Sequence, residues 1–162
     1  MPAQLHLHQV LSGPQGKKFG ALPKVAIPTD DETLLLFAQE LLVHLRKHGI
    51  YRRDNVPVVP YQAKARLEII SAQAFRTFVD RYVACAKQKY DQKGTPFDVI
   101  RTINKETAQG VLECEEFWSG LREIVAVNPV PKCVIDLEAE KPLRLLQPGY
   151  DEKTKTLTFG KD

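Results

Sequence analysis

Apolar residues recur every three or four positions in two stretches of the chain, a spacing that places them on one face of a helix. The first stretch runs from Thr29 to His48, and the apolar positions in it are Leu34, Phe37, Ala38, Leu41, Leu42 and Leu45. The second runs from about Ser71 to about Tyr90, with Ala72, Phe75, Phe78, Val79, Tyr82, Val83 and Ala86. We therefore predict two long amphipathic helices, which share one core with strands at the C-terminus.

Residues suited to helix termini bound both stretches. Thr29-Asp30-Asp31-Glu32 predicts a capping box, in which Thr29 accepts a hydrogen bond from a backbone amide while Glu32 reaches back. Gly49 suits the positive φ that commonly follows a helix. Ser71 is a typical N-cap for the second helix.

A β-hairpin is predicted between the two helices. Its strands are residues 50–53 and 56–59, its turn is Asp54-Asn55, and residues 66–70 predict a further strand. Because Pro57 and Pro60 have no amide hydrogen to donate, we expect the second strand to lie at a sheet edge or to end early.

After the second helix, two short helical segments are predicted. The first begins at Thr95-Pro96 and runs to about Ile103, and the second is capped by Asn104 and runs to about Cys114. A turn follows that contains Phe117 and Trp118. We expect these two aromatic residues to anchor the C-terminal strands against the helices, with stacking on nucleic-acid bases as the minor alternative.

The C-terminal third contains short apolar runs separated by prolines, which predict strands at 134–137, 143–146 and 156–159. Pro148-Gly149 lies between the last two, and a turn there favours positive φ at Gly149 with Tyr150 packed inward. The fold class is therefore α+β: one domain over residues 29–162, preceded by an extended N-terminal leader over residues 1–28.

The motif Pro148-Gly149-Tyr150-Asp151-x-x-Thr154 resembles a turn in phage- and plasmid-type replicative helicase-primase proteins, where it precedes an ATP-driven helicase domain. Gly49-Ile50-Tyr51-Arg52-Arg53 is similar to the opening of the same region, so the resemblance spans about Asp30 to Phe159. The chain departs from the family at Lys155, where glycine is usual, and at Asp54-Asn55. The resemblance implies a non-catalytic accessory region of a mobile-element replication system, with DNA and a replicative helicase or primase as partners.

Charge is distributed unevenly along the middle of the chain. Tyr61 to Arg101 contains eight Lys and Arg residues against four acidic ones, whereas Thr102 to Glu140 contains three against eight. Basic side chains attract phosphates irrespective of base sequence. The candidate DNA-binding residues are Arg52 and Arg53 at the hairpin, with Lys87, Lys89 and Lys93 after the second helix. The alternative is a protein-interaction module that docks a partner through the acidic 102–140 face.

Patterns typical of enzymes are absent from the sequence. It contains no nucleotide-binding glycine loop, no nucleophile elbow and no zinc-protease motif, so we predict neither a catalytic activity nor a cofactor. A small hydrolase that uses the carboxylates of Glu113 to Glu116 is the least favoured reading. No metal site is predicted from His6 and His8 or from His44 and His48, since each pair lacks a third ligand.

The expected location is the cytoplasm. The three cysteines are far apart and show no C-x-x-C spacing, which is typical of reduced thiols. No apolar run approaches the length of a signal peptide or a membrane span. The sequence leaves open whether the DNA is single- or double-stranded.

Overall fold

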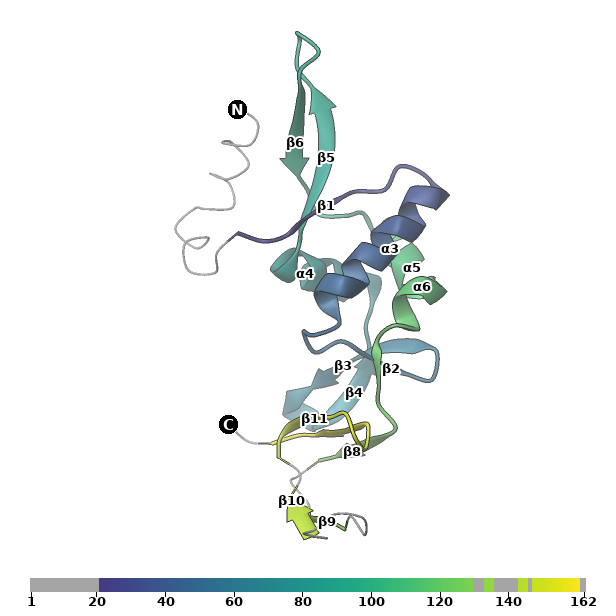
Figure 1. Cartoon of the computed structure of the whole chain (residues 1–162), viewed down its shortest axis with the longest axis vertical. Coiled ribbons are helices and arrows are strands. Elements are labelled where there is room, and N and C mark those ends of the chain that lie inside the picture. Colours follow the sequence, from purple (N-terminus) through teal and green to yellow (C-terminus); the bar gives the residue numbers. More distant parts are fainter. Residues whose placement is uncertain (1–20, 130–132, 136–142, 146, 161–162) are drawn as a thin grey trace.

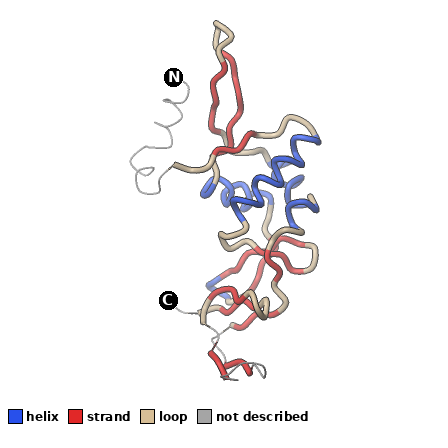
Figure 2. The backbone as a smooth tube through the Cα atoms, viewed as in Figure 1, coloured by secondary structure: helices blue, strands red, loops and turns tan. Residues whose placement is uncertain are grey.

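A computed structural model describes residues 21–129, 133–135, 143–145 and 147–160 of the chain. Figures 1 and 2 show an elongated molecule with helices across its middle, a β-hairpin projecting from one end, and small sheets at the other. The predicted α+β class and the single domain are confirmed. No helix in the described ranges is long and apolar enough to cross a bilayer.

The helices and strands follow one another along the chain. The helices are α3 (Asp31–Leu45), α4 (Ala72–Tyr82), α5 (Lys105–Glu113) and α6 (Glu115–Trp118), with a short 3-10 turn at Gln62–Lys64. The strands are β1 (Lys24–Ala26), β2 (Tyr51–Arg53), β3 (Val56–Tyr61), β4 (Arg66–Ile69), β5 (Ala84–Tyr90), β6 (Pro96–Ile100), β7 (Arg122–Glu123), β8 (Ala126–Asn128), β9 (Cys133–Ile135), β10 (Leu143–Leu145), β11 (Gly149–Asp151) and β12 (Thr156–Thr158).

Helix α3 begins one residue later than predicted. Its N-cap is Asp30, whose carboxylate accepts a hydrogen bond from the Thr33 amide at 2.8 Å, while the Thr33 hydroxyl accepts one from the Asp30 amide at 2.9 Å. The bond from the Thr33 amide holds the pKa of the Asp30 carboxyl below its ordinary value. A capping box is therefore present, but Asp30 and Thr33 form it in place of Thr29 and Glu32.

The second long helix is shorter than predicted. It ends at Tyr82, because Val83 is extended (φ −139°, ψ 140°) and residues 84–90 form β5. Ala84, Cys85 and Ala86 pair with β1 on one side, and β5 continues along β6 on the other. The predicted helix from Thr95-Pro96 is likewise wrong, since β6 occupies Pro96–Ile100. Strand pairing overrides the expected helix in both segments, through the distant strand β1 for β5 and through the adjacent strand β5 for β6.

Strand β1 lies inside the range assigned to the leader. It pairs in parallel with β5, and Val25 is buried against the helices. A three-residue strand carries too little periodicity to be recognised in a proline-rich sequence. The histidine pair at positions 6 and 8 lies outside the described residues.

The hairpin of β2 and β3 is confirmed, but the edge position of β3 is wrong. The sheet order is β4-β3-β2-β7, so β3 is an inner strand. Pro57 lies opposite Arg52 of β2 and before the ladder with β4 begins, and Pro60 lies opposite Leu67 of β4 and beyond the end of β2. Each proline thus pairs with a strand on one side only. A residue in this position can lack an amide hydrogen without interrupting hydrogen bonds to two neighbouring strands.

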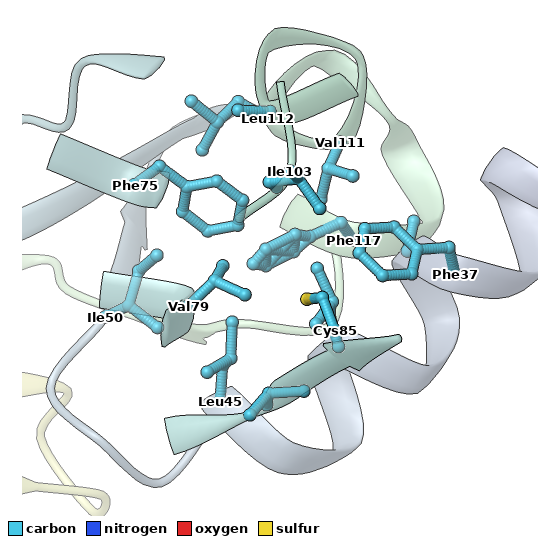
Figure 3. Packing of buried hydrophobic residues seen from close by; sticks show 14 of the residues in the cluster. Phe37, Leu45, Ile50, Phe75, Val79, Cys85, Ile103, Val111, Leu112 and Phe117 are labelled. Carbon is cyan, nitrogen blue, oxygen red and sulfur yellow. The ribbon is translucent and has the colours of Figure 1, made fainter. Parts of the chain in front are cut away.

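Two separate hydrophobic clusters stabilise the fold, and this corrects the predicted single core. The larger one joins α3, α4, α5 and α6 to β1 and β5, and Figure 3 shows Phe117 at its centre between Phe75 and Phe37. The smaller one joins the β2–β3 hairpin to the C-terminal strands through Tyr51, Val58, Ile124, Leu157 and Phe159. Phe117 and Trp118 pack in the helical cluster, so they do not anchor the C-terminal strands as expected.

The C-terminal motif behaves in part as predicted. Gly149 has φ +117°, and the Tyr150 hydroxyl donates a hydrogen bond to the Glu123 carbonyl at 2.6 Å. Gly149, however, is the first residue of β11, and the chain reverses over residues 152–155 before β12. Lys155 adopts positive φ (53°). β9 and β10 pair in antiparallel fashion, and their residues overlap the strands predicted at 134–137 and 143–146.

Cys85 is a structural thiol in the helical cluster. Burial raises its pKa to about 12, and the nearby Asp80 carboxylate adds to the shift. Because the thiolate is the reactive form, we expect iodoacetamide at pH 8 to leave Cys85 unmodified in the folded protein and to modify it fully in denaturant. Peptide mapping by mass spectrometry measures this, with the half-exposed Cys114 as an internal control that reacts first. Labelling of Cys85 as fast as Cys114 would contradict the placement of β5 in the core.

Candidate nucleic-acid interface

The hairpin of β5 and β6 projects from the helical layer (Figure 1). Its base is held in a three-stranded sheet, in which β1 pairs with residues 84–86 only. Beyond Ala86 and Ile100 the hairpin continues as a two-stranded ribbon to the turn at residues 91–95. No side chain of this ribbon is fully buried: Lys87 is exposed, whereas Lys89 and Phe97 are half-buried.

The register of the hairpin sorts its side chains onto two faces. Opposite residues in an antiparallel pair share a face, and successive residues alternate between faces. Lys87 lies opposite Val99 and Lys89 lies opposite Phe97, so these four residues share one face. Gln88, Asp98, Tyr90 and Pro96 occupy the other. We call the first of these the lysine face.

The three lysines of the hairpin are not neutralised. Lys87, Lys89 and Lys93 make no ion pair with any residue in the described ranges. Of the two hairpin carboxylates, Asp98 pairs with Lys24 of β1. Asp91 shapes the turn, because its Oδ1 accepts hydrogen bonds from the amides of Lys93 and Thr95, both at 2.8 Å. The hairpin therefore carries free positive charge on an ordered frame.

Arg52 and Arg53 lie elsewhere. Both belong to β2, and Figures 1 and 2 show the four-stranded sheet on the opposite side of the helices from the β5–β6 hairpin. The Arg52 guanidinium lies 3.6 Å from the Glu123 carboxylate and donates a hydrogen bond to the Asp54 carbonyl at 3.3 Å, whereas Arg53 is exposed. The structure thus brings the three lysines together and separates them from the two arginines.

A second basic group surrounds Glu123 and was not singled out in the sequence. The Tyr51 and Tyr150 rings lie 5.1 Å apart, centroid to centroid, and the Arg122 guanidinium packs against both, at 4.8 and 5.0 Å from their centroids. Lys155 Nζ lies 3.2 Å from Glu123 Oε2, which also faces Arg52. These contacts link β2, β7 and β11, so the group joins the four-stranded sheet to the three-stranded sheet of β8, β11 and β12. Only the fold brings these residues together, and no sequence spacing indicates it.

The acidic residues of the 102–140 segment that the structure describes do not converge on a catalytic site. Glu113 Oε1 accepts a hydrogen bond from Gln109 at 2.7 Å, and Glu116 accepts one from the Cys114 thiol at 3.1 Å. Burial raises the pKa of that thiol, which disfavours a nucleophilic thiolate. Among the residues that the structure describes, no group of three or more histidine, cysteine or carboxylate side chains could hold a metal ion.

An open cleft of about 630 Å³ lies beside these acids. The β2–β3 turn, the junction of β4 and α4, and helix α5 form its walls, with Trp118 at its edge. Lys105 and Glu113 are the charged residues in its lining. The lining offers neither a nucleophile with an adjacent base nor a paired carboxylate, so the cleft supports no specific reaction.

The chain was compared with models of protein families, with curated proteins and with solved structures, and none of these three comparisons finds a match.

Proposed function

We propose that this chain is a non-catalytic DNA-binding domain, the accessory part of a mobile-element replication helicase-primase system. One observation carries the DNA-binding part: Lys87, Lys89 and Lys93 lie on a hairpin that projects from the body, and none of them has an acidic partner among the described residues. The assignment to a replication system rests on the sequence resemblance around Gly149 and Tyr51. Such a domain would work in the cytoplasm beside a replicative helicase or primase.

Phosphate contact is the chemistry that this arrangement favours. Lysine ammonium groups are compact charges that attract phosphates without reading bases, so binding is expected to be micromolar and independent of sequence. The hairpin lysines form the proposed site, and Arg53 is a candidate for a second contact. Arg52 already faces Glu123, so we assign it a weaker contribution.

The triple variant Lys87→Gln, Lys89→Gln, Lys93→Gln tests the site. Because these side chains lie outside both hydrophobic clusters, folding should survive. We expect DNA affinity to fall by at least about tenfold at low salt, by a similar factor on every sequence. The slope of log affinity against log salt should become shallower by roughly 2 to 3, since each duplex contact contributes about 0.9 and each single-strand contact about 0.7. Fluorescence anisotropy with labelled oligonucleotides measures both quantities.

A matched control separates position from net charge. Lys47, Lys64 and Lys105 are also exposed, and their replacement by glutamine removes the same three charges from other parts of the surface. This control variant should bind DNA nearly as well as the unmodified protein. Equal losses in the two variants would show that only the overall charge matters, and the hairpin would lose its role.

The second candidate function is protein docking through acidic helices α5 and α6, which present Glu106, Glu113, Glu115 and Glu116. This candidate becomes the preferred one if the unmodified protein binds no oligonucleotide even at low salt. A variant with these four residues changed to glutamine should then lose a replicative helicase or primase partner in a pull-down.

A further inference from the structure

We propose that the β5–β6 hairpin selects single-stranded nucleic acid, because Phe97 on the lysine face stacks on an unpaired base while Lys87 and Lys89 hold the neighbouring phosphates. This inference rests on the proposed DNA-binding function and adds the class of strand that is bound.

Phe97 is half-buried on the hairpin, directly opposite the half-buried Lys89. It belongs to neither hydrophobic cluster, and its strand β6 is paired with β5 alone. Tyr90, on the opposite face, is 65 % exposed. The Phe97 ring thus adds to neither cluster but keeps part of its surface open to solvent, and apolar groups on a projecting surface commonly mark a binding site.

The neighbours of Phe97 fit a nucleic-acid strand. Lys89 lies directly opposite Phe97 across the hairpin, and Lys87 lies on the same face two residues further along β5. Cations beside an aromatic ring match a ligand in which charged phosphates alternate with flat bases. The other face lacks this combination of a ring and cations. It carries the Asp98 carboxylate, which repels phosphates, and no lysine of β5 or β6 lies on it.

The choice of a single strand follows from the geometry of stacking. In a duplex, each base face is covered by its neighbours, so an aromatic side chain can stack only after a base has been unstacked at a cost. In a single strand the base faces are accessible, and stacking on aromatic residues tolerates any base. A two-stranded ribbon could instead enter the major groove of a duplex, and the experiment separates these two modes.

The test uses labelled strands of equal length: oligothymidine, oligouridine, an abasic strand with the same phosphates, and a duplex. Anisotropy at low salt should show oligothymidine bound more tightly than the abasic strand, by roughly 5- to 150-fold for one stacked base. Phe97→Leu keeps the apolar side chain but removes the ring, so the variant should bind oligothymidine and the abasic strand alike. Oligouridine shows whether the site accepts RNA as well as DNA.

Two control variants locate the effect. Tyr90→Leu removes a ring from the opposite face of the same hairpin, and Tyr61→Leu removes a 40 % exposed ring from β3. Both should retain the preference for a strand with bases. Circular dichroism checks that each variant is folded, and the comparison of strands on the unmodified protein needs no variant at all.

The outcomes distinguish the two proposals. If the unmodified protein binds the abasic strand as tightly as oligothymidine, or prefers the duplex, single-strand stacking is overturned while phosphate binding stands. If Phe97→Leu keeps the preference for bases, Phe97 is not the stacking residue and the inference fails. If the unmodified protein binds no strand at low salt, the proposed function itself fails.

Discussion

Replacement of Phe117 by alanine is expected to lower the free energy of unfolding by about 3–5 kcal/mol, the largest effect of any single substitution considered. Phe117 is fully buried, and its ring lies 5.4 Å from the ring of Phe75, centroid to centroid, at an interplanar angle of 43°. Figure 3 shows residues from several elements around it, which include Phe37 and Val79. Truncation therefore removes apolar contacts and leaves a cavity that neighbouring helices cannot fill without moving.

Urea denaturation followed by circular dichroism measures this loss. Tyr90→Ala is the control, because this ring is largely exposed on the hairpin and its removal should change stability by no more than about 0.5 kcal/mol. A loss below about 1 kcal/mol for Phe117→Ala would contradict the position of α6 against α4.

Leu41→Ala should destabilise the protein by about 2–5 kcal/mol. Leu41 is fully buried at the middle of α3, one turn from Phe37 and Leu45, and all three belong to the helical cluster. Alanine preserves the helix, since its helix propensity exceeds that of leucine, so the loss reports burial rather than helix formation.

A second substitution on the same helix serves as the control. Val43 is 66 % exposed, and Val43→Ala should cost less than about half a kcal/mol in the same denaturation measurement. If Leu41→Ala also costs less than half a kcal/mol, the stripe of α3 does not face the core.

The separation of the two clusters has a consequence for the candidate site. The base of the β5–β6 hairpin packs in the helical cluster through Cys85, whereas Arg52 and Arg53 belong to a sheet that packs in the smaller cluster. A strand bound at the hairpin therefore need not touch the Glu123 group. That group joins sheets through the mutual contacts of Tyr51, Arg122 and Tyr150.

Local features of the sequence were enough to predict those elements whose own residues determine them. The stripe of α3 and the Ser71 and Asn104 caps depend on residues a few positions apart, and so do the Asp54-Asn55 turn and the positive φ of Gly149. Each of these features forms within one or two turns of chain. The sequence also located Lys87, Lys89 and Lys93 near one another.

The tertiary structure alone decided the identity of residues 84–100. Ala84 to Tyr90 continues the apolar period of α4, so the sequence favours helix there, yet pairing with β1, more than fifty residues earlier, makes it a strand. The register of β5 against β6 then fixes which residues share the lysine face, because a shift of one position would exchange the two faces. Strand pairing depends on partners distant in sequence, whereas a helix and its caps depend on near neighbours. For that reason the lysines were visible in the sequence, and their arrangement around Phe97 was not.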